Sequence, residues 1–523
     1  MREIFKETLL RLAGLVAISA TLVCGCQAAD DPVAARAIKA EPERKPAAIP
    51  KPPDNVTKPG RAGTQARAKK PPEPPAAPRV AAPTGSPTRT AKPSEKPAGR
   101  PAGSSLPPVD EDRIAAHNIR KIEGRELTLY TDLPSDAEID GLPEVFSLAL
   151  PEWAAYFHID ADNLAGWRVR GCLIKDRERF VAAGLLPAGL QFVNGFTRGD
   201  EIWWYEQESA YYRRHLMLHE GTHSLMFGHF GTCGPPWYME AMAELLGTHQ
   251  LKDGRLTLGA FPADRDLVPI WGRIRIVREA VRDGRPLSVG EILAFPTDAY
   301  LQNDTYGWCW AIAAFLDGHP RYRERFRKLP TVLHDTDFNG HFRRSFADDR
   351  ATLNVEWRAF IHEVDYGYDL VRNAIELKPS RPPRASGDKV TVAADRGWQS
   401  TGLRLSADTT YQLQATGRYQ VAAEPKIWWC EPGGVTVRYY RGRPLGILLA
   451  MILPDAEEDG GASWPEPVAI GQSGQLTVDA PGTLYLRIND SPAELADNAG
   501  SLSVDIRTSR DERPQKSRKA PAK

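Results

Sequence analysis

The sequence predicts an α+β domain followed by an all-β sandwich, with a disordered tether in front of both. Three observations support this architecture. Residues 27–111 are rich in proline, alanine, lysine and arginine and contain almost no aromatic side chains. Residues 112–380 combine strand patterns with long apolar helical patterns. Residues 387–508 consist of short alternating strands separated by Gly, Pro and Asp turns, so two folded domains are expected.

The first 26 residues have the pattern of an export signal. An apolar run from Leu12 to Val23 is too short to span a bilayer as a mature helix and is typical of secretory signals. Three basic residues precede it: Arg2, Lys6 and Arg11. We therefore expect an exported protein.

A cysteine motif follows the apolar run. Val23-Cys24-Gly25-Cys26-Gln27 resembles a bacterial lipobox, in which the signal is cut before a cysteine that receives lipid. Cys26 follows a small residue and is the preferred lipidation site, whereas Cys24 follows a valine. The resemblance implies a lipid anchor in the bacterial cell membrane or envelope, facing the periplasm or the exterior. An ordinary signal peptide with incidental cysteines is the alternative.

Residues 27–111 lack the apolar side chains that a core requires, so a disordered tether is expected. A proline-rich chain extends by about 3 Å per residue, which gives a reach of up to roughly 200 Å from the anchor. The basic tail, residues 509–523, is also expected to be disordered. The whole chain has 67 basic and 67 acidic residues, so its net charge of zero offers no argument for nucleic-acid binding.

Strand and helix patterns alternate in the first folded domain. Strands are expected at Glu126–Asp132 and Arg168–Ile174, with a helix at Leu142–Phe157 between them. Two further strands are expected around a turn in Leu190–Tyr205, and mostly helical segments continue to about Leu377. This order suits an α+β domain.

A histidine pair indicates the chemistry of this domain. His219 and His223 lie four residues apart in an amphipathic helical pattern, which places both on one helix face at the spacing that a tetrahedral zinc needs. Glu220 lies beside the first histidine, where its carboxylate can reach a water on the metal. The pattern is that of a zinc hydrolase site.

A second helix is expected at about Trp237–His249. Its Trp-Tyr-Met-Glu-Ala-Met-Ala-Glu segment resembles the Trp-x-x-Glu-Gly-x-Ala-Glu run of gluzincins, zinc peptidases whose third ligand is a glutamate on the helix after the histidine helix. An alanine replaces the commoner glycine, and the sixteen residues between His223 and Glu240 make a slightly short connection. The resemblance implies a zincin-like peptidase domain over residues 112–380, with Glu240 as third zinc ligand and Glu244 orienting a histidine ligand.

Two other histidines compete as zinc ligands. His229 lies six residues after His223, the spacing at which metzincins place their third histidine, but Met226 occupies the position where they need a glycine. Glu240 is therefore preferred as the third ligand. His215 lies one helical turn behind the site and is expected to be packed or hydrogen-bonded rather than to bind the metal.

The expected reaction is hydrolysis by a metal-activated water. Three protein ligands leave one zinc position for water, whose pKa falls to about 7 on binding. Glu220 is expected to take the proton as the water attacks a carbonyl and to pass it to the leaving amine. By the resemblance, Tyr306 stands where some gluzincin aminopeptidases carry a tyrosine that stabilises the transition state, although an aromatic packed at a helix start fits equally. Gluzincins bind an extended peptide along a sheet edge before the zinc helix, which implies a peptide or protein substrate.

Regular short strands with polar turns predict a β-sandwich for residues 387–508. The expected strands are Lys389–Ala393, Tyr411–Thr416, Val435–Tyr440, Gly446–Ile452, Gly474–Val478, Thr483–Asn489 and Gly500–Ile506. Two segments near the end, Leu484–Asp490 and Asp497–Ser501, resemble the end of calcium-dependent galactose-binding bacterial lectins. The resemblance implies four calcium ligands: Asp490, Glu494, Asp497 and Asn498.

Calcium and sugar binding have a simpler alternative at this position. Asn and Asp are favoured in such loops by turn geometry alone, so a polar loop closing two strands is equally consistent. Sugar binding would make envelope glycans a partner of the domain. The four cysteines beyond the lipobox, Cys172, Cys233, Cys309 and Cys430, have no paired zinc-binding spacing, and their disulfide pairing stays open.

Two functions therefore remain. The first is a zinc-dependent peptidase tethered to the cell envelope, and the second is an envelope- or glycan-binding lipoprotein with a catalytically silent zincin scaffold. The joint presence of two histidines and three glutamates in the two helices favours the peptidase. Because protonated histidine does not bind zinc, peptidase activity is expected to collapse below about pH 6.

Overall fold

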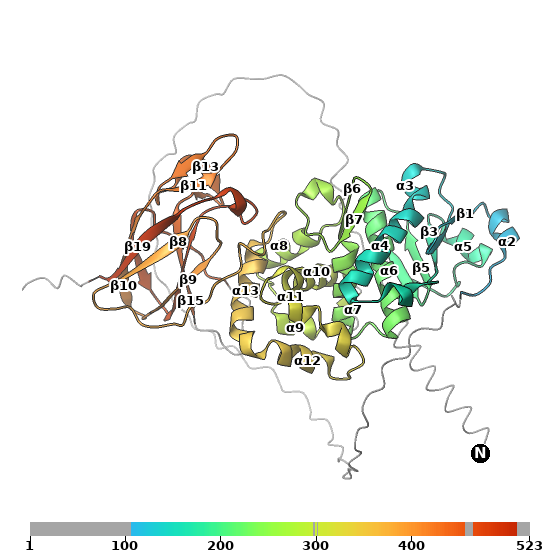
Figure 1. Ribbon diagram of the computed structural model, residues 1–523, viewed down its shortest axis with the longest axis horizontal. Helices are drawn as coiled ribbons and strands as arrows, with labels where there is room; N and C mark the ends of the chain where they lie inside the picture. Colours follow the sequence, from blue (N-terminus) through green and yellow to red (C-terminus); the bar gives the residue numbers. More distant parts are fainter. Residues whose placement is uncertain (1–105, 297–298, 301, 455–463, 510–523) are drawn as a thin grey trace, which may run out of the picture. The chain divides into compact units, whose positions relative to one another are not determined.

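A mixed five-stranded sheet organises the first part of the chain (Figure 1). The computed structural model describes residues 106–296, 299–300, 302–454 and 464–509. Three central strands run parallel, and one antiparallel strand closes each edge. In spatial order the strands are β1 (Arg120–Glu123), β2 (Leu127–Thr131), β3 (Val169–Ile174), β5 (Glu201–Tyr205) and β4 (Gly195–Arg198). The first part of the chain is thus mixed α/β, with β4 at an edge.

The expected export signal, with Cys24 and Cys26, lies outside the described residues. So do residues 27–105 of the expected tether and residues 510–523 of the expected tail. Within the described part of the chain, no helix has the length and apolarity needed to cross a membrane.

Helices surround the sheet and continue beyond it (Figure 1). They are α2 (Glu111–Ala116), α3 (Ala137–Asp140), α4 (Leu142–Phe157), α5 (Arg177–Ala183), α6 (Ala210–Phe230), α7 (Pro236–Gly247), α8 (Arg273–Arg282), α9 (Val289–Leu293), α10 (Asn303–Gly318), α11 (Arg323–Phe326), α12 (Phe338–Ser345) and α13 (Arg350–Glu363). A hairpin of β6 (His249–Lys252) and β7 (Arg255–Leu258), which the sequence pattern did not predict, interrupts them after α7.

The expected strands Glu126–Asp132 and Arg168–Ile174 and the helix Leu142–Phe157 are confirmed to within one residue at each end. The two strands expected in Leu190–Tyr205 are also present, but the first of them begins five residues late, at Gly195. The second helix of the histidine region, however, ends at Gly247 rather than at His249. Thr248 leaves the helix in an extended conformation, and His249 pairs with Leu258 as the first residue of β6. The prediction was wrong at this end because the strand pairing comes from residues beyond the helix.

α6 is buried on almost every side, which corrects the expectation of an amphipathic helix. Ser209 caps its first turn by accepting a hydrogen bond from Tyr212 N, and Gly231 ends it with a φ of 73°. The helix packs against β4, β5, α4 and α7. A helix covered by four elements needs apolar or paired side chains all around.

Gly221 allows α4 to pack directly on α6. A Cβ atom at this position would lie 2.7 Å from Phe146 Cε2 and 2.9 Å from Trp153 Cη2. The indole nitrogen of Trp153 also donates a hydrogen bond of 3.0 Å to Thr222 Oγ1. The aromatic side chains of α4 thereby determine how closely α6, the histidine helix, packs against α4.

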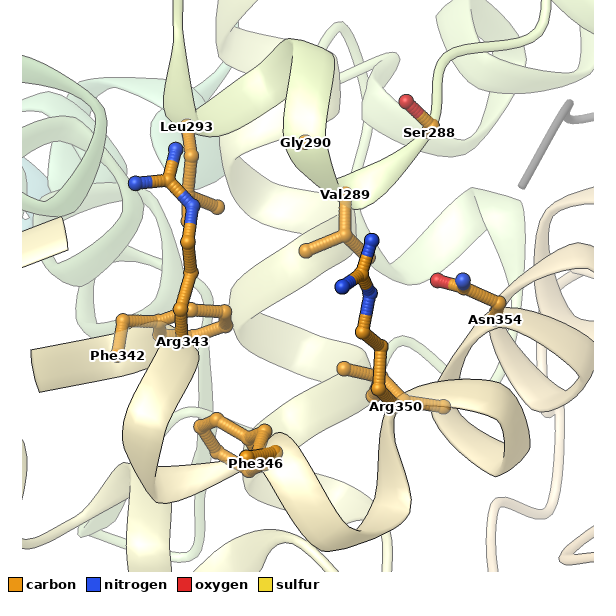
Figure 2. Close-up of a pocket in the computed structure, with 11 residues that line it drawn as sticks. Ser288, Val289, Gly290, Leu293, Phe342, Arg343, Phe346, Arg350 and Asn354 are labelled. Atoms are coloured by element: carbon orange, nitrogen blue, oxygen red, sulfur yellow. The ribbon is translucent and has the colours of Figure 1, made fainter. Parts of the chain in front are cut away.

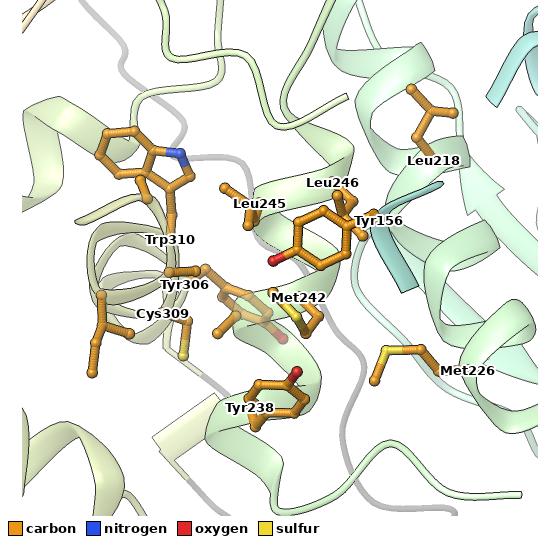
Figure 3. Close-up of a cluster of buried hydrophobic side chains, with 14 of the residues drawn as sticks. Tyr156, Leu218, Met226, Tyr238, Met242, Leu245, Leu246, Tyr306, Cys309 and Trp310 are labelled. Atoms are coloured by element: carbon orange, nitrogen blue, oxygen red, sulfur yellow. The ribbon is translucent and has the colours of Figure 1, made fainter. Parts of the chain in front are cut away.

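The main core lies among α6, α7 and α10, where aromatic, methionine and leucine side chains meet (Figure 3). It includes Met226, Tyr238, Met242, Leu245, Leu246, Tyr306 and Trp310. The four described cysteines are buried and free, so none forms a disulfide. Packing rather than covalent linkage therefore positions α7 against α6.

The C-terminal β region contains two four-stranded antiparallel sheets around one apolar core. One sheet holds, in order, β17 (Ser473–Val478), β10 (Thr409–Thr416), β19 (Ser501–Thr508) and β8 (Asp388–Ala393). The other holds β16 (Val468–Ala469), β15 (Leu448–Pro454), β18 (Gly482–Ile488) and β9 (Gln399–Leu405). Two small hairpins complete the region: β11 (Tyr419–Ala422) with β12 (Trp428–Cys430), and β13 (Val435–Tyr440) with β14 (Arg443–Leu445).

Each expected strand of this region overlaps an observed one, but five strands were missed. β11, β12, β14 and β16 are only two to four residues long, too short for alternation to be recognised. β9 contains Gly402 with a φ of 70°, and its register against β18 shifts. The expected strand at Gly446–Ile452 starts later, at Leu448, because Gly446 adopts a φ of 83°.

A buried charge pair joins α13 to the C-terminal β region. Glu363 forms an ion pair with Arg487, and it also accepts a hydrogen bond of 2.8 Å from Trp398 Nε1. Apolar residues of α13 and of β15 and β18 share a small core around this pair. The described residues belong to one compact unit, and this contact is part of it.

Candidate metal centre

Three potential ligand atoms converge where α6 meets α7. His219 Nε2 lies 3.3 Å from Glu240 Oε2, and His223 Nε2 lies 3.6 Å from the same oxygen. The two imidazole Nε2 atoms are 3.1 Å apart. Ligand atoms about 2.0–2.1 Å from a tetrahedral zinc are separated by about 3.3 Å from one another. The three separations therefore fit the edges of one face of a zinc tetrahedron.

The neighbouring histidines keep Glu240 in an ionised form that can bind a metal. Burial alone would raise the pKa of Glu240. The neighbouring His223 and His219 together have the larger, opposite effect, and the pKa falls to about 2. The carboxylate is therefore ionised at neutral pH, as a zinc ligand must be. Glu240 is fully buried, and an ionised carboxylate in such a place requires positive partners.

Glu244 lies one turn further along α7 and faces the other side of His219. Its Oε1 is 3.4 Å from His219 Nδ1. Arg273, the first residue of α8, donates hydrogen bonds of 2.8 Å to both carboxylate oxygens of Glu244. Burial raises the pKa of Glu244, but Arg273 and His215 bring it well below its usual value. An ionised Glu244 can accept a hydrogen bond from His219 Nδ1–H, which would leave Nε2 unprotonated and directed towards Glu240.

His215 and His229 lie in different surroundings. His215 is fully buried, stacks against Tyr212, and has its Nε2 atom 3.6 Å from Glu244 Oε2. It forms part of a second potential ligand group, with His219 and Glu244. His229 is half-buried and belongs to neither of the potential ligand groups found among the described residues. The geometry thus favours Glu240 over His229.

Glu220 is held by the edge strand β4. Thr197 donates a hydrogen bond of 2.6 Å to Glu220 Oε2 and also contacts the Glu220 carbonyl oxygen at 3.0 Å. A Cβ atom on Gly195 would lie 2.3 Å from Glu220 Oε1, so a larger residue there would force the carboxylate to move. Oε1 is buried and accepts no hydrogen bond from a described residue. Burial raises the pKa of Glu220, which makes it a better proton acceptor than an exposed glutamate.

Tyr306 lies beside the triad in the first turn of α10. Its ring centroid is 6.4 Å from that of His219, and its hydroxyl donates a hydrogen bond of 3.2 Å to the Tyr300 carbonyl oxygen. The side chain is almost fully buried and also belongs to the main core. The structure places Tyr306 near the candidate site, and its role in a transition state stays a prediction.

The centre is closed to solvent. His219, Glu220, Glu240 and Glu244 are 0% exposed and His223 is 1% exposed. Exchange of a bound metal would therefore depend on local opening of the surrounding helices.

The four candidate calcium residues lie in one loop but have different partners. Asp490 Oδ2 accepts a hydrogen bond of 2.8 Å from Asn498 Nδ2, and Asp497 Oδ2 accepts one of 3.1 Å from Ala423 N. Buried oxygens of Asp497 and Asn498, one on each side chain, accept no hydrogen bond from a described residue. Glu494 instead faces Arg438, whose Nη2 is 2.8 Å from both carboxylate oxygens.

These contacts separate Glu494 from the other three candidate calcium ligands. Asp490, Asp497 and Asn498 have buried oxygens within the loop, whereas Glu494 points to an exposed arginine. Burial is the main cause that raises the pKa of Asp490, to about 6. A cation beside Asp490 would offset that cost of burial, and calcium at this loop stays a prediction.

Thr197 and Arg273 are the functional candidates that the sequence analysis missed. Arg273 has a detectable signal, because it precedes Val277 and Ala280 on the buried face of α8. A charged residue in an apolar stripe at helical spacing indicates a buried partner. Thr197 has no comparable signal, since a threonine in a strand is ordinary.

Comparisons with known proteins identify no family. No family model and no curated protein matches the chain. Among solved structures, the N-terminal domain of EclA, described as a PllA-like lectin, is similar to this chain with 24% sequence identity. The match covers 23% of this chain and 95% of that one, with a TM-score of 0.19. A likeness of this degree establishes neither the fold nor a ligand of the C-terminal β region.

Proposed function

We propose that this protein is a zinc-dependent peptidase in which His219, His223 and Glu240 hold the metal. The observation that carries the proposal is the convergence of three ligand atoms at separations of 3.1, 3.3 and 3.6 Å, with Glu220 next to the first ligand in the chain. Two imidazoles and a carboxylate form a donor set that zinc uses in hydrolytic enzymes.

Zinc at this centre would act as a Lewis acid and would lower the pKa of a coordinated water. Glu244 and Arg273 support the metal ligands from behind, because Arg273 keeps Glu244 ionised and Glu244 orients His219. The residues present therefore fit the metal and its surroundings.

Glu220 would act as the proton carrier of the reaction. Thr197 fixes one carboxylate oxygen, while Oε1 carries no hydrogen bond from a described residue. Glu220 would use this oxygen to take a proton from the attacking water and return it to the leaving nitrogen. Its burial favours proton uptake, because burial disfavours the ionised carboxylate and so raises the pKa of Glu220.

The edge strand β4 supports a peptide as the substrate. It is the terminal strand of the five-stranded sheet, and its Thr197 contacts Glu220 directly. An extended peptide that adds to a sheet edge gains main-chain hydrogen bonds in register. Such binding along β4 would bring a peptide bond close to Glu220.

We further propose that the protein acts outside the cytoplasm, attached to the bacterial envelope by lipid on Cys26. The support is the cysteine motif after the apolar run Leu12–Val23. The substrates would then be peptides or proteins of the envelope or exterior.

The peptidase proposal is tested with a Glu220→Gln variant and a library of unstructured peptides. The unaltered protein is expected to cleave a subset of the library, and Glu220→Gln is expected to lose at least roughly a hundredfold in kcat/KM while keeping its zinc. Cleavage by Glu220→Gln at the original rate would reject the role of Glu220. Zinc binding without any cleavage would favour the alternative function, in which the zincin scaffold is catalytically silent.

Glycan binding by the C-terminal β region is a second candidate function. The β11–β12 and β13–β14 hairpins expose large apolar side chains, among them Trp429 at 51% and Tyr439 at 58% exposure. Arg418 lies 5.3 Å above the Trp429 ring. Exposed aromatic rings of this kind mark binding surfaces. Binding to an array of envelope glycans, with and without calcium and with Trp429→Ala as the control, separates this candidate from the first.

A further inference from the structure

The pocket between α9, α12 and the start of α13 has a volume of about 420 Å³ and two arginines in its wall, Arg343 and Arg350 (Figure 2). Arg350 has an interaction of its own, so the pair does not offer two free charges to an anion. A stronger binding surface lies on the two small hairpins of the C-terminal β region, β11–β12 and β13–β14.

Apolar side chains gather on the outside of these hairpins. Ten large apolar side chains are exposed among the residues that the structure describes, and four of them lie within residues 427–439. These four are Ile427, Trp429, Val437 and Tyr439. Val437 is 81% exposed and Ile427 is 54% exposed, so neither side chain belongs to the core. A group of exposed apolar side chains marks a surface that binds a partner.

The two hairpins lie at the same end of the C-terminal β region (Figure 1). Ala423 N, in the turn after β11, donates a hydrogen bond of 3.1 Å to Asp497 Oδ2. Arg438 of β13 forms an ion pair of 2.8 Å with Glu494. Both hairpins are therefore attached to one loop, residues 494–497, which holds them next to each other.

Basic residues are concentrated in the hairpins. Residues 387–508 contain ten basic and fifteen acidic residues, whereas residues 418–445 contain five of the basic and only two of the acidic ones. The five basic residues are Arg418, Lys426, Arg438, Arg441 and Arg443. The hairpins are thus the positive part of an otherwise acidic region.

Three of these basic side chains have no carboxylate partner among the described residues: Arg418, Lys426 and Arg441. Arg418 lies over the Trp429 ring at 5.3 Å, and Lys426 is exposed next to Ile427 in the sequence. Arg441 donates a hydrogen bond only to a backbone carbonyl oxygen, which leaves its charge uncompensated. Positive charge and apolar side chains therefore occur together on the hairpins.

We propose that the two hairpins dock the C-terminal β region on an anionic lipid bilayer. Ile427 and Val437 enter the acyl-chain boundary, where burial of their side chains is favourable. Trp429 and Tyr439 lie at the level of the headgroups, the region of a membrane in which these two residue types are enriched. The free cations of the hairpins contact the anionic headgroups.

The aliphatic side chains favour lipid over a glycan as the partner of this surface. A sugar is bound by polar groups and aromatic faces, and Ile427 and Val437 supply neither. Hydrocarbon, in contrast, accepts both aliphatic and aromatic side chains. The docking proposal does not depend on the candidate metal centre or on the lipid at Cys26. Glycan binding by the same hairpins, the second candidate function, is one outcome of the test.

A fluorescent label at position 437 tests the proposal in the full chain. Cys24→Ser and Cys26→Ser remove the expected lipidation sites, and the four described cysteines are buried and so protected from labelling. Val437→Cys in this background carries an environment-sensitive fluorophore. Vesicles that contain phosphatidylglycerol are expected to shift its emission to shorter wavelengths, and vesicles of phosphatidylcholine alone are expected to do so much less. No shift with the anionic vesicles would overturn the proposal.

The same label at Val371→Cys is the matched control. Val371 is a valine of 52% exposure between α13 and β8, outside the hairpins. Its label is expected to stay in water even when the N-terminal segment brings the chain to the vesicles. Equal shifts at both positions would show nonspecific contact and would also overturn the proposal. Binding of envelope glycans with no lipid-induced shift at position 437 would assign the hairpins to the second candidate function instead.

Charge variants of the labelled chain test the role of the cations. Arg418→Gln with Lys426→Gln is expected to weaken binding to the anionic vesicles at least about tenfold. Lys389→Gln with Arg507→Gln removes the same charge from exposed positions of β8 and β19 and is expected to leave the affinity nearly unchanged. Equal affinities for the two double variants would reject electrostatic docking through the hairpins.

Discussion

Arg273 donates two hydrogen bonds of 2.8 Å to the carboxylate of Glu244, one to each oxygen. Both side chains are buried, and Glu244 in turn lies 3.4 Å from His219 Nδ1. The pair links the start of α8 to the helix that carries Glu240. A histidine whose Nδ1 faces an ionised carboxylate keeps its Nε2 available as a ligand.

Arg273→Gln is therefore expected to weaken zinc binding roughly ten- to hundredfold, although Arg273 is not itself a ligand. The substitution leaves Glu244 ionised and buried without its main positive partner, so the free energy of unfolding should also fall by about 3–5 kcal/mol. Competition with a fluorescent zinc chelator and thermal unfolding measure the two effects. The double variant Arg273→Gln with Glu244→Gln is the control, because it removes the uncompensated charge and should recover part of the lost stability. Unchanged zinc affinity in Arg273→Gln would show that the pair serves packing alone.

Thr197→Val is expected to reduce kcat roughly tenfold or more while the zinc content stays at the parental value. Thr197 is not a ligand, but its hydroxyl fixes Glu220 Oε2 at 2.6 Å. Thr197→Ser retains the hydroxyl and should retain most of the activity. Steady-state kinetics on one cleaved peptide provides the comparison. Equal rates for the valine and serine variants would contradict a positioning role.

Gly221→Ala is expected to lower the free energy of unfolding by about 1–3 kcal/mol. The added methyl group would meet Phe146 and Trp153 at less than 3 Å, and both rings are fully buried. Denaturant unfolding measures the change. Gly290→Ala in α9 is the control, because its Cβ atom meets only one atom within 4 Å, and its stability should be unchanged or slightly higher. Equal stabilities for the two variants would contradict the packing of α4 on α6.

The local part of the candidate site was predictable from the sequence, because His219, Glu220 and His223 depend only on the spacing of a single helix. Glu240 required the resemblance of the next helix to a known pattern, and the structure does bring it to within 3.3 Å of His219. The burial of α6 on almost every side was not predictable. It results from four elements that pack around the helix, and no sequence period records how many neighbours a helix has.

Other contacts depended on residues far apart in the chain. Thr197 reaches Glu220 from an edge strand, and Arg273 reaches Glu244 from the start of α8. Both contacts follow from how the sheet and the helices pack, which short-range patterns do not encode. In the C-terminal β region the longer alternating strands were predictable, whereas β9 was missed because Gly402 breaks its alternation.

Calcium is expected to stabilise the folded protein by binding Asp490. It should also offset the loss of stability that the burial of Asp490 causes as the pH rises. Burial raises the pKa of Asp490 to about 6, above its ordinary value of 3.8. The folded state therefore holds a proton that the unfolded state has released, so without calcium this group's stabilising contribution is full below about pH 4 and is lost as the pH rises through 6. Bound calcium favours the ionised form and should restore stability at pH 7.

Thermal unfolding at pH 5 and pH 7, with and without calcium, measures this effect. Asp490→Asn is the control, because it removes both the titration and the ionised ligand. The variant should show no response to calcium. A calcium response of the same size in Asp490→Asn would exclude Asp490 as a ligand, and no response in the parent would favour the polar-loop alternative.

The most direct test of the central claim is the zinc content of the purified protein, measured by elemental mass spectrometry beside Glu240→Gln and His229→Gln. Both substitutions approximately keep the size of the side chain. Of the two substituted residues, only Glu240 lies within 4 Å of the Nε2 atoms of His219 and His223. We expect one zinc per chain in the parent, retained in His229→Gln and lost in Glu240→Gln. No zinc in the parent, or equal zinc in the parent and Glu240→Gln, would contradict the proposed metal centre.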